Sequence, residues 1–128
     1  MALLYSDEQQ AIGREAGRVL DARYDKDRLL ALLLASGAYD ATFWNTAIEQ
    51  GWTGLAIPEA HGGLGLGLTD LGIVAEAAGR VCGGAPFLST NHGAASVLLA
   101  AADREAWLPR LASGEARGAL AFAEGNEA

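Results

Sequence analysis

Apolar residues recur along the first part of this chain at the spacing of amphipathic helices. Ser6 and Gln9 have the spacing of a capping box, and the apolar positions behind them share one helical face: Ile12, Ala16, Val19 and Leu20. An Asp27 cap predicts a second helix as far as Ser36, with Gly37 as its terminator. Five leucines crowd this second helix too closely for a single stripe, which predicts that it is widely buried.

A third helix is expected to begin at Asp40 and to end at Gly51, a residue suited to the left-handed conformation that closes helices. Its expected inward residues are Phe43, Trp44, Ala47 and Ile48. Residues 52–68 are rich in glycine and interrupted by Pro58, so a helix cannot continue through them. We expect a long ordered loop or a small extended segment, and loops of this length usually carry function.

The pattern predicts a fourth helix after this loop. Thr69 is its expected cap, with Leu68 and Ile73 spaced as a hydrophobic staple. The inward face holds Leu71, Val74, Ala78 and Val81. Gly83 and Gly84 end the helix.

Residues 86–90 form a second connector, and Ser89 or Thr90 is the expected cap of a fifth helix. The apolar residues of that helix repeat at helical spacing: Ala94, Val97, Leu98 and Ala101. Abundant alanine and sparse β-branched residues also favour helices over strands along the whole chain.

A sixth helix is expected to begin at Asp103, and Pro109 predicts a bend or break near Leu108. After Gly114, residues 117–122 could begin a strand. No internal repeat or separating linker is present, so residues 1–128 are expected to form one domain. The predicted fold is all-α, a compact orthogonal or up-and-down bundle of about six helices with a long Gly-rich ordered loop between helices three and four.

Charge and apolar run length exclude two classes of partner. Sixteen acidic residues outweigh nine Lys and Arg, giving a formal charge of -7, and no basic residue occurs between Arg28 and Arg80, which argues against nucleic acid. The longest apolar run, Leu29 to Ala35, has seven residues. A membrane span needs roughly 20, and the first residues lack the pattern of a signal peptide. The single Cys82 excludes an intrachain disulfide and is interpreted as a small packed residue in a reducing, cytoplasmic compartment.

No metal-binding or phosphate-binding motif is visible in the sequence. The imidazole and thiol groups, on His61, His92 and Cys82, have none of the usual metal-ligand spacings. His61 is interpreted as a solvated or locally hydrogen-bonded side chain. The run from Gly62 to Gly67 lacks the glycine spacing of a phosphate loop and has no Gly-Lys-Ser/Thr, so we interpret it as a tightly packed turn.

No catalytic set is visible either, and we assign no catalytic residue to this chain. Glu59 and Glu76 lie far apart in the sequence, which favours capping or ion pairing over paired acid and base catalysis. Three tryptophans fall on apolar faces or helix ends and are predicted to be core residues: Trp44, Trp52 and Trp107.

The order of short motifs along the chain resembles the amino-terminal domain of acyl-CoA dehydrogenases. The matching segments are Phe43-Trp44, Gln50 to Glu59, His61 to Leu66, Leu68-Thr69-Asp70, Val74-x-Glu76-x-x-Gly79-Arg80, Trp107 to Glu115 and Leu120-Ala121. They span essentially the whole chain in the order of the family. One Gly-rich loop would be a weak signal, but the series is specific.

The resemblance implies a three-part flavoprotein of which only the first, all-helical domain is present here. In this family a carboxylate on the third domain removes the α-proton of an acyl-CoA, FAD accepts a hydride from the β-carbon, and a trans-2-enoyl thioester forms. Electrons leave to an electron-transfer flavoprotein, and the parent is expected to be a homo-oligomer or hetero-oligomer. The chain alone is expected to be inactive and not to bind FAD. The family's Thr-Glu-Pro junction is replaced by Ala123-Glu124-Gly125, which puts the usual junction contacts in doubt.

The resemblance also implies that the fourth and fifth helices and their connector wall one side of the acyl pocket. By position, the substrate-binding candidates are Ala85, Pro86, Phe87, Leu88, Asn91, Ala94 and Val97, with Gly93 beside them. An acyl chain needs a concave apolar wall, and small residues let it approach the helix backbone. The same small residues would equally permit tight helix packing, and the sequence leaves both interpretations open.

Two other functions stay open at this point. A stand-alone interaction or scaffolding domain could have kept the fold without catalysis and could pair with a complete dehydrogenase. An unrelated helical binding module would require the motif series to be a coincidence.

Overall fold

The computed structural model describes residues 5–35, 37, 39–101 and 104–123, and every regular element in these ranges is helical. The elements are α1 (Asp7–Arg23), α2 (Lys26–Leu34), α3 (Ala41–Glu49), η1 (Trp52–Gly54), η2 (Glu59–His61), α4 (Leu68–Arg80), η3 (Ser89–Ala94), α5 (Ala95–Ala100) and α6 (Arg104–Ala112). The labels η1 and η2 denote 3₁₀ turns, and η3 is a π-helical segment. The all-α prediction is therefore confirmed for the described residues.

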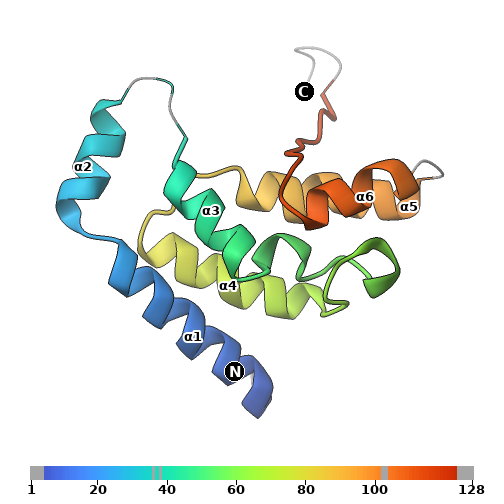
Figure 1. Cartoon of the computed structure of the whole chain (residues 1–128), viewed down its shortest axis with the longest axis horizontal. Helices are drawn as coiled ribbons and strands as arrows, with labels where there is room; N and C mark the ends of the chain where they lie inside the picture. Colours follow the sequence, from blue (N-terminus) through green and yellow to red (C-terminus); the bar gives the residue numbers. More distant parts are fainter. Residues whose placement is uncertain (1–4, 36, 38, 102–103, 124–128) are drawn as a thin grey trace.

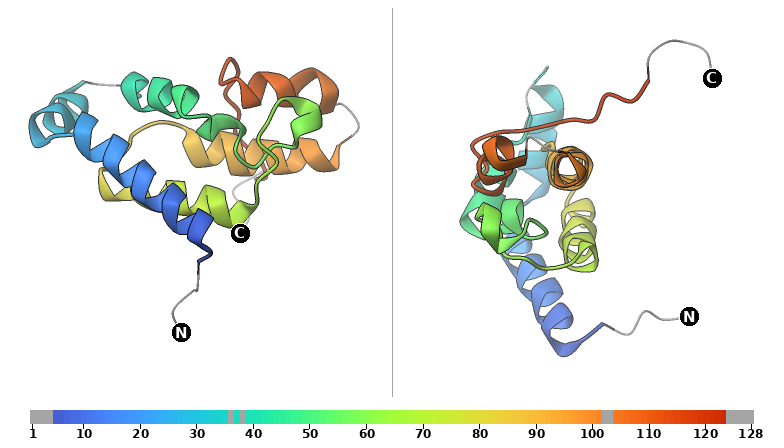
Figure 2. Two further views of the ribbon diagram at one scale, coloured as in Figure 1. Left: turned by 60° about the horizontal axis from the view of Figure 1, so that its bottom comes forward. Right: turned by 90° about the vertical axis from the view of Figure 1, so that its right-hand side faces the viewer.

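The helices form two packed groups that meet at α3. Figure 1 shows α1 beside α4 on one side and α5 beside α6 on the other, while α2 stands apart at one end. The views in Figure 2 agree with this arrangement. The larger apolar cluster joins α1, α3 and α4, with Leu20, Phe43 and Val74 fully enclosed. A smaller cluster joins α5 and α6 around Leu108 and receives Ile57 from the loop.

The predicted start of the first helix is confirmed. The Ser6 hydroxyl accepts the Gln9 N–H at 3.1 Å, and the Gln9 side-chain oxygen accepts the Ser6 N–H at 3.1 Å. Three of the four predicted inward residues are buried, namely Ala16, Val19 and Leu20, while Ile12 packs at the edge of the cluster. Local capping and the helical period were enough to place this element.

The predicted cap and the predicted burial of the second helix are both wrong. Asp25, not Asp27, caps α2, since its carboxylate accepts the Arg28 N–H at 2.8 Å. No residue of α2 is buried, because the helix lies at the end of the molecule, where its outer face meets no other described element. The predicted last residue, Ser36, lies outside the described residues, and Gly37 takes a left-handed φ of 74°.

The prediction for the third helix holds except at Ile48. The Asp40 carboxylate accepts the Phe43 N–H at 3.0 Å, and Gly51 has a φ of 74°. Phe43, Trp44 and Ala47 are buried, but the inward prediction for Ile48 is wrong. Thr46 is enclosed instead, because its hydroxyl accepts a 2.7 Å hydrogen bond from Arg23 of α1.

Residues 52–67 form an ordered loop that folds back on itself. After the two 3₁₀ turns, residues 64–66 donate three backbone hydrogen bonds of 2.9 Å to the first half of the loop: Leu64 to Gly54, Gly65 to Ile57 and Leu66 to Leu55. The following helix begins at Leu68, with Gly67 as its N-cap residue. The Thr69 cap is therefore wrong, because Asp70 binds the Gly67 N–H at 2.9 Å and starts the helix earlier.

The predicted caps of the fifth helix are also wrong. The backbone is already helical at Leu88, and the Thr90 N–H bonds to the Pro86 carbonyl at 3.1 Å. Pro86 has the fixed φ that suits a first helical turn, so the helix starts before Ser89 and passes through η3 into α5. Cys82 is not in a helix and not packed, because it follows α4 in an exposed turn with a φ of 52°.

The prediction for the sixth helix was a bend or a break near Leu108, and the break is wrong, because the helix contains Pro109 and runs on to Ala112. Leu108 is fully enclosed, and this packing holds the helix despite the missing donor. Trp44 and Trp52 are core residues as predicted, but Trp107 is exposed under the Arg110 guanidinium.

The end of the described chain differs from the predicted strand. Residues 117–122 lie in no strand, since pairing needs a neighbouring strand and the described ranges contain none. Asp103, Glu124 and Gly125 lie outside the described residues. Within the same ranges, no helix combines the length and hydropathy needed to cross a bilayer.

Candidate functional site

An apolar groove lies between α4 and the segment that enters η3. It consists of two depressions, one of about 170 Å³ and one of about 220 Å³, and Leu88 lines both. The first is lined by Phe43, Ala75, Ala78, Gly79, Gly83, Ala85, Phe87 and Leu88. The second is lined by Leu68, Leu71, Gly72, Leu88 and His92. We call these two depressions the α4–η3 groove.

The structure brings only some of the predicted substrate-binding residues to this groove. Ala85, Phe87 and Leu88 line it, with the Leu88 side chain exposed. Pro86 is half-buried at the start of the helix, and Val97 is exposed one turn beyond η3. The first residues of the connector therefore shape the groove, and the later ones lie away from it.

Asn91 and Ala94 face other parts of the domain. Asn91 is buried in η3, and neither atom of its side-chain amide has a hydrogen-bond partner among the described residues. Ala94 lies under the end of the chain, so close that a Cβ placed on Gly118 would fall 2.6 Å from the Ala94 Cβ. A large residue at position 94 would first displace residues 118–120.

Three small residues of α4 also line the groove, and the sequence pattern did not identify them. Gly72, Ala75 and Gly79 all line it, and they recur at the spacing of one helical face. That spacing is visible in the sequence, but it also suits close helix packing, so it could not be assigned without the neighbouring elements. His92 was likewise missed; it is exposed and is the one imidazole lining the α4–η3 groove.

Thr90 of η3 forms hydrogen bonds with the backbone of Gly118. Its hydroxyl donates to the Gly118 carbonyl at 3.1 Å and accepts the Gly118 N–H at 3.1 Å, and the side chain is fully enclosed. The Thr90 hydroxyl is therefore one of the groups that hold residues 114–118 against the helical body, together with Trp44, Arg110 and the Arg117–Tyr39 hydrogen bond.

Replacing Thr90 by valine should release residues 116–120 from η3. Valine keeps the volume but leaves both Gly118 groups without their partner, so we expect a loss of about 1–3 kcal/mol. Hydrogen exchange at the Gly118 amide measures the release, and Ser89→Ala, which removes an exposed hydroxyl one residue away, is the matched control. Unchanged protection in Thr90→Val would contradict this role.

The buried carboxylate of Asp40 connects the end of α1 with α2 and α3. Asp40 accepts the Tyr24 hydroxyl at 2.7 Å and pairs with the Arg28 guanidinium, which also covers the Tyr24 ring at 4.7 Å. Burial by itself raises the pKa of Asp40, but the bonds from Tyr24 and Phe43 and the charge of Arg28 outweigh it and hold the pKa below its ordinary value. Burial and the bond to Asp40 raise the pKa of Tyr24, which keeps its proton as donor.

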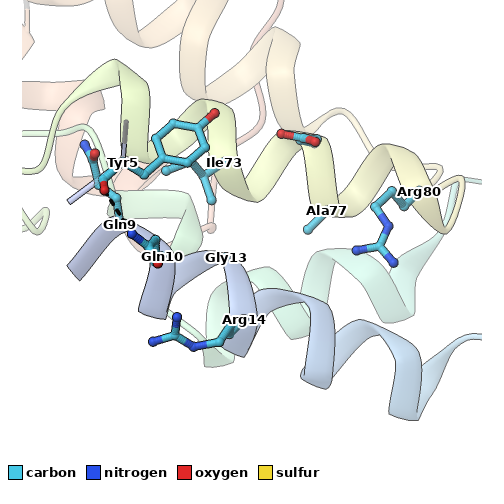
Figure 3. A pocket seen from close by; sticks show the side chains of 9 residues that line it. Tyr5, Gln9, Gln10, Gly13, Arg14, Ile73, Ala77 and Arg80 are labelled. Atoms are coloured by element: carbon cyan, nitrogen blue, oxygen red, sulfur yellow. Dashed lines mark hydrogen bonds between the residues drawn. The ribbon is translucent and has the colours of Figure 1, made fainter. Parts of the chain in front are cut away.

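Two further hollows flank α1. One, of about 310 Å³, lies between α1 and α4. In Figure 3 Arg80 reaches from α4 toward α1, and the Gln10 side chain donates to the Tyr5 carbonyl at 3.1 Å. An apolar hollow of about 340 Å³ lies between α1 and the Gly-rich loop. In the described ranges neither Glu59 nor Glu76 forms an ion pair, so the predicted pairing of these residues is not seen.

The model of the acyl-CoA dehydrogenase N-terminal domain matches residues 6–115. This chain belongs to the acyl-CoA dehydrogenase family. It is 39% identical over 82 residues to (2S)-methylsuccinyl-CoA dehydrogenase of Cereibacter sphaeroides, which covers 61% of this chain and 15% of that protein. It is 37% identical over 95 residues to the mitochondrial isovaleryl-CoA dehydrogenase of Arabidopsis thaliana, covering 68% of this chain and 22% of that protein.

Solved structures agree with the family assignment. The Tcur3481–Tcur3483 steroid ACAD is similar to this chain with a TM-score of 0.78 and 29% sequence identity. The match covers 87% of this chain and 31% of the chain in that structure. The ChsE4–ChsE5 complex of Mycobacterium tuberculosis is similar with a TM-score of 0.70 and 25% sequence identity. That match covers 90% of this chain and 30% of the chain in that structure. The chain thus spans about a third or less of the length of the relatives it matches.

The Gly-rich loop of this acyl-CoA dehydrogenase domain offers no flavin cradle, because Gly63 is packed onto its own loop, where a Cβ would lie 2.6 Å from the Gly54 carbonyl oxygen. Nor do the described residues contain a cluster of three or more side chains able to hold a metal ion. We therefore assign no cofactor contact to this chain.

Proposed function

We propose that this chain forms one apolar wall of the acyl-CoA pocket in an FAD-dependent acyl-CoA dehydrogenase, which converts an acyl-CoA to its trans-2-enoyl thioester. The observation that carries the proposal is the α4–η3 groove, with the exposed Leu88 above a floor that contains Gly72, Ala75 and Gly79. Small residues leave room for a ligand chain, and the surrounding apolar side chains exclude water from it.

In this proposal the chain binds and orients the acyl group, and the reaction itself takes place on parts of the protein outside it. The family's carboxylate base and its flavin supply proton removal and hydride acceptance. The Gly-rich loop offers no flavin cradle, and no carboxylate is among the groove's lining residues. The isolated chain is accordingly expected to be inactive.

The proposed partners of the parent are acyl-CoA, an electron-transfer flavoprotein and a further subunit. The two structural neighbours are named as pairs of proteins, Tcur3481 with Tcur3483 and ChsE4 with ChsE5. That similarity supports a hetero-oligomer over an isolated polypeptide. The proposed reaction would place the parent protein in fatty acid metabolism, and the cytoplasmic location stays a prediction.

Replacing Gly72 by leucine in the full-length enzyme should shorten the acyl chain that it accepts. A Cβ at Gly72 meets nothing within 4 Å, so the new side chain fills the groove without disturbing α4. In an apolar pocket, one methylene more or less changes the ratio of kcat/KM between two substrates by roughly tenfold or more. We expect kcat/KM to fall by about that factor for long acyl-CoA substrates and to change little for short ones.

Gly17→Leu is the matched control, because Gly17 lies within α1 with equally open space and outside the groove. It should leave the chain-length profile unchanged. A loss in Gly72→Leu that is equal for all chain lengths would contradict the pocket assignment. A full-length protein without any turnover, yet able to bind a complete dehydrogenase, would favour the scaffolding alternative.

A further inference from the structure

His92 is the one titratable side chain among the described residues that line the α4–η3 groove. It belongs to η3 and is exposed, and the other lining residues are apolar side chains or glycines. In a largely apolar pocket, a few polar groups fix the orientation of the ligand and provide specificity. The place of His92 therefore bears on which acyl groups the groove takes.

The helix that carries His92 changes from apolar to polar along the groove. Leu88, His92 and Ser96 follow one another at intervals of four residues, so they share one helical face. Ala85 lines the first depression, Leu88 lines both, and His92 lines only the second, opposite Gly72 of α4. A ligand that lies along the groove contacts apolar side chains over most of its length and meets the imidazole at the end remote from Ala85.

The imidazole keeps a nitrogen that can bond to a ligand. The Ser96 Oγ lies 3.5 Å from the His92 Nδ1, at the outer limit of a hydrogen bond, and Ser96 is the only hydrogen-bond partner of His92 in the described part of the chain. The second ring nitrogen, Nε2, is therefore available. A hydroxyl group both donates and accepts, so it can bond to Nε2 in either tautomer of the neutral ring.

The charge of the chain favours a neutral hydroxyl over a carboxylate as the group that meets His92. The formal charge is -7, and neither lysine nor arginine is among the residues that line the groove. A carboxylate entering the groove would give up water without a lysine or arginine to pair with, which is costly. A hydroxyl exchanges one hydrogen bond to water for one to the imidazole.

We propose that His92 selects acyl-CoA substrates that carry a hydroxyl group on the part of the acyl chain remote from the thioester. This inference rests on the proposed function, in which the groove holds the acyl group and the reacting carbons lie against other parts of the protein. A plain alkyl chain would cover the imidazole and leave Nε2 without a partner, whereas a hydroxyl replaces the lost water. His92 is thus a specificity residue and takes no part in proton or hydride transfer.

The test uses the full-length enzyme and pairs of acyl-CoA substrates of equal length, one ending in a methyl group and one with a hydroxyl on its last carbon. At the length that reaches His92, the wild type should turn over the hydroxylated member more efficiently. His92→Leu should lower the ratio of the two kcat/KM values by about threefold to tenfold, the effect of one hydrogen bond. His92→Gln, whose amide still bonds to a hydroxyl, should retain most of the preference.

His61→Leu is the matched control, because His61 is the other histidine of the chain and lies on the Gly-rich loop outside the groove. It should leave the ratio unchanged. Circular dichroism checks that all three variants stay folded.

The outcomes separate this inference from the function on which it rests. If Gly72→Leu shortens the accepted chain but His92→Leu leaves the ratio unchanged, the pocket assignment stands and the role of His92 is wrong. An equal loss for both members of each pair in His92→Leu would also overturn that role. So would a wild-type preference for a substrate ending in a carboxylate. A full-length enzyme that turns over no acyl-CoA at all would overturn the proposed function and this inference together.

Discussion

Replacing Asp40 by alanine should lower the free energy of unfolding by about 3–5 kcal/mol, the cost of breaking a buried ion pair from one side. The carboxylate is almost fully enclosed and accepts from the Tyr24 hydroxyl, the Arg28 guanidinium and the Phe43 N–H. Alanine leaves the first two without a partner and removes the cap of α3. Chemical denaturation monitored by circular dichroism measures the loss.

Asp25→Ala is the matched control for this variant. Asp25 also caps a helix, through the Arg28 N–H at 2.8 Å, but it is exposed, so its loss should cost only about 1 kcal/mol. Equal losses in the two variants would contradict the interpretation of Asp40 as a junction of three helices. Tyr24→Phe, which removes one of the three donors, should fall between them.

The pH dependence provides a second readout of the same carboxylate. The folded pKa of Asp40 lies below its ordinary value of 3.8, so the folded state favours the ionised form. The stabilisation is present above the unfolded pKa and is lost as the pH falls through the folded pKa. The stability difference between wild type and Asp40→Asn should therefore be constant near neutral pH and shrink below about pH 4.

Replacing Gly63 by alanine should destabilise the domain by about 3 kcal/mol or more, the upper range for forcing a methyl group into a packed site. A Cβ there would fall onto the Ile57 carbonyl group and lie 2.6 Å from the Gly54 carbonyl oxygen. Both contacts are with backbone, which cannot rotate away as a side chain could. The loop would have to open, although three backbone hydrogen bonds close it.

Substitutions at two other glycines distinguish the cost of steric crowding from the cost of a left-handed backbone conformation. Gly62 has a φ of 81° but open space around it, so Gly62→Ala should cost about 1 kcal/mol. Gly72 lies in α4 with open space, and Gly72→Ala should stabilise by up to about 1 kcal/mol. Thermal melts of the three variants give the comparison. A Gly63→Ala protein as stable as Gly62→Ala would show that the loop is not closely packed.

Sequence periodicity and capping placed most of the helices without knowledge of their neighbours. The Ser6 capping box, the Asp40 cap and the left-handed Gly51 are local devices, in which a side chain or a φ angle acts within one turn. The family followed from a series of such motifs in order, and residues 6–115 match its domain. These features depend on neighbouring residues in the chain, so the sequence specifies them directly.

Where several caps compete, the sequence could not choose among them. Asp25 and Asp27 are both good caps, as are Thr69 and the Gly67–Asp70 pair, and the difference in free energy between them is about that of one hydrogen bond. The π-helical segment at the start of the fifth helix contains Thr90, whose hydroxyl bonds to Gly118, 28 residues away. Contacts between distant segments decide such boundaries.

Burial was the property that only the tertiary structure decided. The leucines of α2 have the pattern of an enclosed helix, yet no described element lies over Leu33, whereas Thr46 and Asp40 are enclosed because Arg23 and Arg28 reach them from other helices. The groove likewise exists only where Gly72 and Gly79 of α4 meet Leu88 across the fold. Contact with any apolar surface lowers the free energy of a hydrophobic side chain, so the sequence pattern shows which faces are suited to burial. Only the packing of distant segments determines which of these faces is buried.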